Sequence, residues 1–274
     1  LCALFTFVQS YWNQSIQQEI YQAGDWDAQL LEIHAGQLDL IRNNQNIQSI
    51  MVKGDNQTAL LPTASGLPYL LIQNCDGAYW GGMREKNLIL RGRVPQAPGE
   101  IVVGKSFFEQ NPSVEIGDRL NLGERRIGNT TVDFLSPIQS GEEFVKTEKV
   151  QYTIVGEIDM TVSSAYNGYP AYGWLDTAAL SEDTGIVAYL QVTQPRKVYE
   201  IIPQIAEDIG LQPDEFGDYP FRYHTALLGM YGIYAPGHFL SSDLPKLTLA
   251  LGLVMAASMA VFAYIIRGAF SISA

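Results

Sequence analysis

Cysteine, histidine and basic residues are all scarce in this chain of 274 residues. It has two cysteines, Cys2 and Cys75. Two thiols cannot make a disulfide framework or a four-cysteine zinc site. Lys and Arg number 17 against 29 Asp and Glu, so the formal net charge is −12. So acidic a chain is a poor candidate for binding the nucleic-acid backbone, which calls for a basic patch.

The short patterns of common active sites are absent as well. His34, His224 and His238 lack the HxxxH or HExxH spacing of a metal site. Serine-hydrolase GxSxG and the phosphate-binding patterns GxxxxGK[ST] and GxGxxG do not occur. Close carboxylates such as Asp25 and Asp27 are more often solvated surface acids in so acidic a chain. We therefore expect no catalytic, cofactor-binding or metal-binding residue, and no enzyme activity.

The low content of charge, 17% against 47% apolar residues, indicates a concentrated apolar segment. Residues 247–266, LTLALGLVMAASMAVFAYII, carry no charge and are bracketed by Lys246 and Arg267. A helix of this length reaches about 30 Å, the thickness of a bilayer core. We expect a transmembrane helix over 245–267, with its apolar ends at Leu247 and Ile266, followed by the start of a cytoplasmic segment at 268–274.

Small residues recur at every fourth position of this apolar segment: Gly252, Ala256 and Ala260. A stripe of small side chains lets a second membrane helix approach closely. In an alanine-rich segment the same spacing also arises by chance. The sequence leaves the two interpretations open.

The N-terminal residues LCALFTFVQSYW are apolar but too few to span a bilayer. They lack the basic start of a signal peptide, and we interpret 1–12 as the end of a first transmembrane helix. Trp12, Ile16 and Ile20 then recur at every fourth position. This spacing predicts that the helix continues over 13–25 as an amphipathic stalk.

The acid excess lies between the two apolar ends, whose charges are Lys246 and Arg267 alone. A large segment without a basic bias does not favour the cytoplasm under the positive-inside rule. We expect a protein of the cell membrane, with the bulk of this chain extracytoplasmic. On that oxidising side, a lone Cys75 is expected to be buried and inert.

Strand–helix–strand patterns occur at both ends of the middle segment, and we assign them to two halves of one α+β layer, 26–86 and 161–244. The first half has a strand at 26–33, a helix at 35–44 and a strand at 46–54. The second half has a strand at 186–194, an amphipathic helix at 196–210 and a strand at 219–227. Apolar residues share one face of that second helix, and Gly210 suits its C-terminal cap: Val198, Ile201, Ile202, Ile205 and Ile209.

Between these halves, residues 87–160 read as an inserted β-rich subdomain. Short alternating runs such as LILRGR, GEIVVG and VQYTIVGEID are separated by Pro and Gly turns. A short helix is expected at 106–112. The stretch AYNGYPAYGW that follows has little regular signal, and we interpret it as loop residues packed against the core rather than as a contact surface.

The middle segment resembles the extracytoplasmic domain of FtsX-like, MacB-type ABC transporter permeases. The likeness runs through GRVP at 92–95, EIVV at 100–103, GD at 117–118 and YTIVG at 152–156. It covers nearly the whole chain, and the order of these motifs is more specific than any one of them. The motif residues have fold-forming roles in turns, bulges and strand starts: Gly92, Arg93, Pro95, Glu100, Gly117, Asp118, Tyr152 and Gly156.

The resemblance implies a permease with four membrane spans, of which this chain supplies the first two and the domain between them. It implies a dimer with a second permease copy, a separate cytoplasmic ATPase subunit that holds the ATP, and contact with membrane lipid. ATP hydrolysis would tilt the stalks and move the external domains, which is called mechanotransmission. Roles in this class include export, antimicrobial-peptide resistance, lipoprotein handling and control of cell-wall hydrolases, with a peptide, lipoprotein or hydrolase as partner.

Two other readings compete. A two-span receptor or kinase with an external ligand-sensing domain fits the length equally well, although such a domain usually lacks an inserted β-rich part. A membrane-anchored hydrolase is disfavoured because the sequence has no nucleophile–base pattern and no metal pattern.

Overall fold

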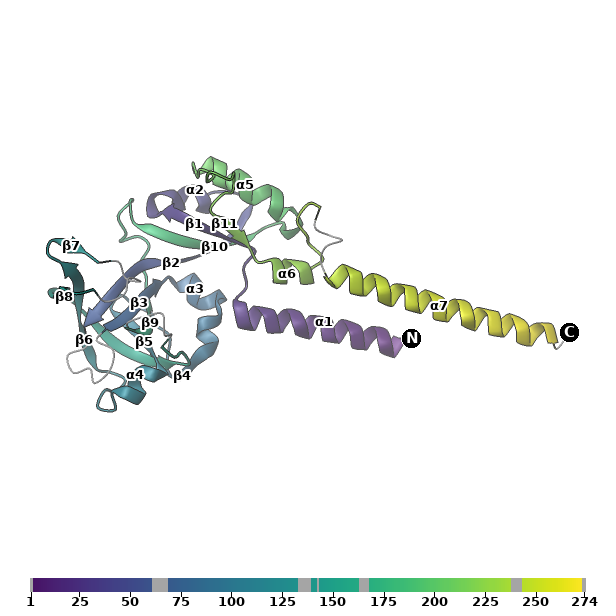
Figure 1. The fold of residues 1–274 in the computed structure, drawn as a ribbon, viewed down its shortest axis with the longest axis horizontal. Helices are drawn as coiled ribbons and strands as arrows, with labels where there is room; N and C mark the ends of the chain where they lie inside the picture. The colour runs from purple at the N-terminus through teal and green to yellow at the C-terminus, as the bar shows by residue number, and fades with distance from the viewer. Residues whose placement is uncertain are drawn as a thin grey trace. The chain divides into compact units, whose positions relative to one another are not determined.

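The structure is a computed structural model that describes residues 2–60, 69–132, 139–141, 143–162, 168–237 and 243–272 (Figure 1). Contacts between residues group the chain into two compact units, Leu1–Leu227 and Leu228–Ala274. The first unit holds the sheet and the N-terminal helix α1 (Cys2–Ala23). The second holds the last half of α6 (Thr225–Met230) and all of α7 (Asp243–Ile272).

The two predicted strand–helix–strand units are present. The first consists of β1 (Ala28–His34), the short helices η1 (Ala35–Gln37) and α2 (Leu38–Arg42), and β2 (Ile47–Leu60). The second consists of β10 (Gly185–Val192), η3 (Pro195–Lys197), α5 (Val198–Asp208) and β11 (Phe221–Tyr223). The last strand is shorter than expected, because the chain has turned into helix α6 by Thr225.

These two units interleave within one sheet. Their strands lie in the order β11-β1-β10-β2, and each neighbouring pair is antiparallel. Helices α2 and α5 pack on this part of the sheet, against β2 and β1 respectively (Figure 1). The expected apolar face of α5 is buried from Val198 to Ile209. Gly210 follows with φ +77°, a conformation that suits the end of a helix.

The middle of the chain adds strands to the same sheet. They are β3 (Tyr69–Cys75), β4 (Ile89–Gly92), β5 (Glu100–Gly104), β6 (Arg119–Ile127), β7 (Thr130–Thr131), β8 (Glu143–Ile158) and β9 (Gly168–Trp174). Short helices lie between some of them: α3 (Gly77–Gly82), η2 (Arg84–Leu88) and α4 (Lys105–Gln110). The order continues β2-β3-β9-β5-β8-β6-β7, and β2 also pairs with β6 through Ala59 and Leu122. The strands from β2 to β6 in this order therefore close into a ring.

Two apolar clusters lie on the two opposite faces of the strands that form this ring. One gathers side chains of β3, β5, β6, β8 and β9 around Phe107 of α4. The other lies beneath α3 and η2 and includes Tyr79, Trp80 and Tyr189. Strand β5 contributes Ile101 and Val103 to the first cluster and Val102 to the second. Alternation along a strand places successive side chains on opposite faces, so β5 is apolar on both.

The expected loop within AYNGYPAYGW is wrong for its second half. Residues Gly168–Trp174 form β9, which pairs parallel with β3 and antiparallel with β5. Tyr169 is fully buried in the first cluster and Tyr172 is buried in the second. Pro170, which cannot donate a backbone hydrogen bond, lies just before the residues of β9 that pair with β5, Ala171–Gly173. The proline therefore does not interrupt that pairing.

Helix α7 contains the whole apolar segment of 247–266. Large apolar side chains along it are exposed, among them Leu253, Phe262 and Tyr264. Within the residues that the structure describes, however, no helix combines the length and the hydropathy needed to cross a membrane.

Candidate functional site

The stalk helix α1 packs on the short helix η2 at the edge of the second apolar cluster. Ile16 is buried, and Trp12 and Ile20 on the same helix face are half-buried. Tyr11 and Tyr21 are exposed. The stripe of Trp12, Ile16 and Ile20 is therefore the packed face of the stalk, as its spacing predicts.

Helix α1 ends at Ala23 because Gly24 adopts φ +94°. The amide of Gly24 donates to the carbonyl of Ile20 at 2.9 Å. A Cβ at Gly24 would lie 2.7 Å from Met83 Sδ. Glycine is thus required both for the left-handed turn and for the close approach to η2. The next amide, that of Asp25, donates to the carbonyl of Gly82 at 3.1 Å.

Polar side chains fasten the end of the stalk on two sides. Toward η2, Asn87 Nδ2 donates to the carbonyl of Tyr21 at 3.1 Å, and the Tyr21 hydroxyl reaches the carbonyl of Asn87 at 3.5 Å. On the other side, His224 follows β11 directly, and its Nε2 lies 3.2 Å from Glu19 Oε1. These contacts join α1 to segments far away in the chain.

Trp26 connects the stalk to the sheet. Its indole N–H donates to the carbonyl of Ala23 at 3.0 Å, and its ring stacks on His224 with centroids 4.4 Å apart. The neighbouring Asp27 is buried, and its carboxylate accepts the amide of Val192 in β10 at 2.8 Å. Burial raises the pKa of Asp27 from its usual range, and this backbone bond partly offsets the rise.

The chain enters and leaves the sheet through two strands that are paired with each other. Ala28 of β1 lies opposite Tyr223 of β11. The stalk α1 leads into β1, and β11 leads by way of α6 toward α7. A displacement applied at either attachment therefore acts on the same edge of the sheet.

The motif residues on which the resemblance rests meet near the C-terminal end of β8. Gly92 has φ +76°, and a Cβ there would lie 2.2 Å from the carbonyl oxygen of Val155. Gly156 faces it, with a Cβ position 2.7 Å from the carbonyl oxygen of Arg93. The ladder between β5 and β8 shifts register at this point. The two glycines therefore allow β4 and a bulge of β8 to touch backbone to backbone.

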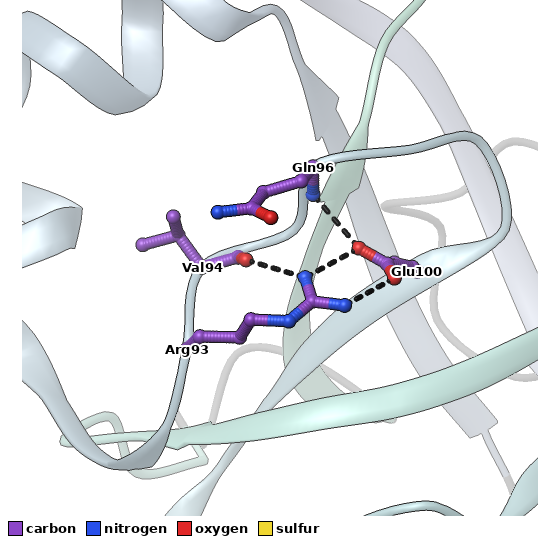
Figure 2. Close-up of polar contacts among 4 residues, drawn as sticks. All are labelled: Arg93, Val94, Gln96 and Glu100. Atoms are coloured by element: carbon purple, nitrogen blue, oxygen red, sulfur yellow. Dashed lines mark hydrogen bonds and ion pairs between the residues drawn. The ribbon is translucent and has the colours of Figure 1, made fainter.

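Arg93 and Glu100 close the turn that joins β4 to β5 (Figure 2). The guanidinium donates to both carboxylate oxygens, with Nη1 at 2.6 Å from Oε2, and also to the carbonyl of Val94 at 3.1 Å. The amide of Gln96 donates to the same carboxylate at 2.8 Å. The Arg93 hydrogen bonds, helped by this amide, hold the pKa of Glu100 at about 2, below its ordinary value of 4.5.

Glu100→Gln is expected to lower the thermal midpoint by a few degrees at neutral pH, because the bidentate pair is half-exposed and such pairs contribute modestly. Because folding lowers the pKa of Glu100, its carboxylate stabilises the fold at pH values above the ordinary pKa of 4.5. This contribution is lost as the pH falls toward about 2. The variant should therefore lose less stability than the wild type across that window. Thermal unfolding at several acidic pH values measures this, with Glu109→Gln in α4 as the control. Equal acid sensitivity of Glu100→Gln and wild type would contradict the assignment.

The remaining motif residues also stabilise β8. Gly117 has φ +106°, and its amide donates to the carbonyl of Ile154 at 2.8 Å. The Asp118 carboxylate accepts the amide of Glu115 at 2.9 Å, which caps the turn before β6. Tyr152 is buried in the first cluster with its hydroxyl bonded to Gln57, and Pro95, two residues after Arg93, is buried as well. These contacts are those of fold-forming residues.

Among the described residues, no group of three or more histidine, cysteine or acidic side chains is placed to hold a metal ion. Cys75 is fully buried, as expected, and burial raises the pKa of its thiol well above the usual range. Burial likewise raises the pKa of Tyr189 to about 12. These groups are protonated and inert at neutral pH. The absence of catalysis, cofactor and metal stays a prediction.

The residues marked in the apolar segment all lie in α7. Gly252, Ala256 and Ala260 are exposed along this helix, and so is Ile266. The side chain of Leu247 is not among the parts of α7 that the structure describes. His238, which precedes this helix, lies outside the described residues altogether. Neither the packing role of the small-residue stripe nor the segment boundaries expected from the sequence are tested by these positions.

The sequence predicted only some of the residues that attach the stalk α1 to the rest of the domain. Spacing indicated Trp12, Ile16 and Ile20, whereas Glu19, Asn87 and His224 carry no local signal. Each is an ordinary polar residue in its own segment. They meet at the end of α1 only in the folded chain, where Asn87 of η2 contacts Tyr21 on one side and His224 after β11 contacts Glu19 on the other.

Neither a protein-family model nor a curated protein sequence matches this chain. Solved structures similar to it include the periplasmic region of MacB from Actinobacillus actinomycetemcomitans, at 9% identity and a TM-score of 0.47. The alignment covers 80% of this chain and 97% of the MacB chain. Another is the extracellular domain of the noncanonic ABC-type transporter YknZ from Gram-positive bacteria, at 8% identity and a TM-score of 0.44, covering 73% of this chain and 99% of that one.

A third similar structure is a domain of a putative permease protein from Porphyromonas gingivalis, at 9% identity and a TM-score of 0.39. It covers 71% of this chain and 78% of that one. Identities and TM-scores this low say nothing about ligands or partners.

Proposed function

We propose that this chain is the extracytoplasmic part of an ABC transporter permease subunit, with the two helices that attach it to the membrane. The observation that carries the proposal is the pairing of β1 with β11, from Ala28 opposite Tyr223 to Leu30 opposite Phe221. This pairing joins the strand that follows helix α1 to the strand that leads, by way of α6, toward helix α7. A domain built to receive movement from two membrane helices needs such a pairing.

Membrane insertion rests on the sequence of the helices. The charge-free segment 247–266 has the length of a bilayer core and is bracketed by Lys246 and Arg267. Large apolar side chains stand exposed along α7, such as Leu253, Val254 and Phe262. A soluble helix would normally cover such side chains. We propose that lipid does so here, that α1 provides the end of a first span, and that the sheet domain is extracytoplasmic.

The proposed work of the domain is mechanotransmission. ATP would be hydrolysed on a separate cytoplasmic subunit, and the resulting tilt of α1 would reach η2 through Ile16 and β1 through Trp26. A second permease copy would complete the transporter. The moving external domains would serve export of a peptide or lipoprotein, resistance to antimicrobial peptides, or control of a cell-wall hydrolase. The chain itself would carry no catalytic step and bind no cofactor.

Sequencing the DNA beyond codon 274 and on both sides of the gene tests this proposal directly. We expect two further hydrophobic spans after this segment and a neighbouring gene that encodes GxxxxGK[ST]. Purification of the tagged full-length protein should then recover that ATPase. A coiled signalling helix followed by a kinase or receptor module would overturn the proposal and make the domain a ligand sensor.

A further inference from the structure

His224 has a hydrogen-bond acceptor opposite each ring nitrogen. Its Nδ1 lies 3.1 Å from the backbone carbonyl oxygen of Trp26, and its Nε2 lies 3.2 Å from Glu19 Oε1. The imidazole is buried, with 6% of its side chain exposed, and the Glu19 side chain is 22% exposed. Solvent water therefore has little access to replace either contact.

The number of protons decides whether both contacts are favourable. A carbonyl oxygen only accepts, so Nδ1 must carry a hydrogen, and a neutral imidazole then leaves a lone pair on Nε2. That lone pair would face the lone pairs of an ionised Glu19 carboxylate. The Glu19–His224 pair therefore needs one further proton between Nε2 and Oε1, whichever atom carries it.

We propose that Glu19 and His224 form a proton-dependent latch that fastens the end of stalk α1 to the strand β11. With the extra proton, one charge-assisted bond joins α1 to the residue after β11. Without it, the two groups repel and the contact opens. Loss of the proton leaves α1 held by Ile16 and by the Tyr21–Asn87 contacts, so the helix loosens at its end rather than detaching.

The surroundings of the ring supply the other groups that bear on its charge. From the linker, Trp26 stacks on the imidazole with an interplanar angle of 12°, an arrangement that also suits an imidazolium. Just before β1, the backbone carbonyl of Asp27 accepts the His224 amide at 2.9 Å, and the Asp27 carboxylate interacts electrostatically with the ring. Asp25 lies near Asp27. From α1 the facing group is Glu19 itself.

A latch at this position would make the grip on the stalk depend on external pH. The contact is strongest while the pair holds the extra proton, and it weakens when a rise in pH removes that proton. An effect on transport would rest on the proposed function. The latch itself belongs to the isolated chain and can be measured without an ATPase, so the failure of one is distinguishable from the failure of the other.

The test is amide hydrogen exchange of α1 in the full chain in detergent micelles, at about pH 5.5 and about pH 8, on either side of the histidine range. After correction for the intrinsic rate, protection of the last turn of α1 should fall about tenfold at the higher pH. His224→Gln should abolish the step, because its amide has no proton to lose.

Glu19→Gln separates a latch from mere packing. The Gln amide can donate to a neutral Nε2, so α1 should stay protected at both pH values. Tyr21→Phe, which removes the hydroxyl that faces Asn87, should lower protection equally at both, and His34→Gln should leave the step unchanged. Equal protection of wild-type α1 at the two pH values would overturn the proposal, and so would a pH step that persists in His224→Gln.

Discussion

Gly92→Ala is expected to reduce the free energy of unfolding by about 2–5 kcal/mol, the sum of a clash with the backbone and a strained backbone conformation. The new Cβ would lie 2.2 Å from the carbonyl oxygen of Val155 and 2.7 Å from the Cα of Gly156. Both are backbone atoms, so no side chain can turn aside. The left-handed φ of +76° adds a cost of about 1–2 kcal/mol. Urea unfolding followed by tryptophan fluorescence measures the change.

Two other glycines separate the sources of this cost. Gly117 has φ +106°, and a Cβ there would meet no described atom within 4 Å, so Gly117→Ala should cost only the strain of about 1–2 kcal/mol. Gly81 in α3 has neither constraint, and Gly81→Ala should be neutral or stabilise by up to about 1 kcal/mol. If Gly92→Ala were no less stable than Gly117→Ala, the backbone contact between β4 and β8 would be refuted.

A two-residue insertion between Gln9 and Ser10 is expected to abolish the proposed ATP-driven movement of the sheet domain. Each helical residue turns the axis by about 100°, so the insertion rotates the preceding segment by about 200° relative to the docked Ile16 and Ile20. A rigid stalk would then deliver its tilt in the wrong direction. The measurement is the ATP-dependent change in distance between spin labels on the sheet domains of the assembled, purified transporter.

A seven-residue insertion at the same place is the matched control. Seven residues make nearly two full turns and restore the rotation to within about 20°, although the stalk grows by about 10 Å. This variant should keep most of the movement. Equal movement in the two-residue and seven-residue variants would show that the stalk does not act as a rigid lever, and equal loss in both would show that length rather than rotation matters.

Local patterns were enough to place much of the fold. The amphipathic helix now seen as α5, the stripe on α1 and the strand at Glu100 all follow from side-chain spacing or turn residues in a few consecutive positions. The burial of Cys75 was likewise expected. Strand β9 was missed, because glycine, proline and tyrosine alternate there without a periodic apolar signal, and its neighbours β3 and β5 are what bury it.

The sequence by itself determined the two strand–helix–strand units, the stripe on the stalk, several glycine turns, and that acid and apolar residues are sorted into a middle and two ends. These properties depend on neighbours within a few residues, and spacing records them directly. Only the tertiary structure decided that β1 pairs with β11, that β2 closes a ring with β6, and that Glu19 meets His224. Such contacts join residues far apart in the chain, and their free energy depends on shared burial that no local pattern encodes.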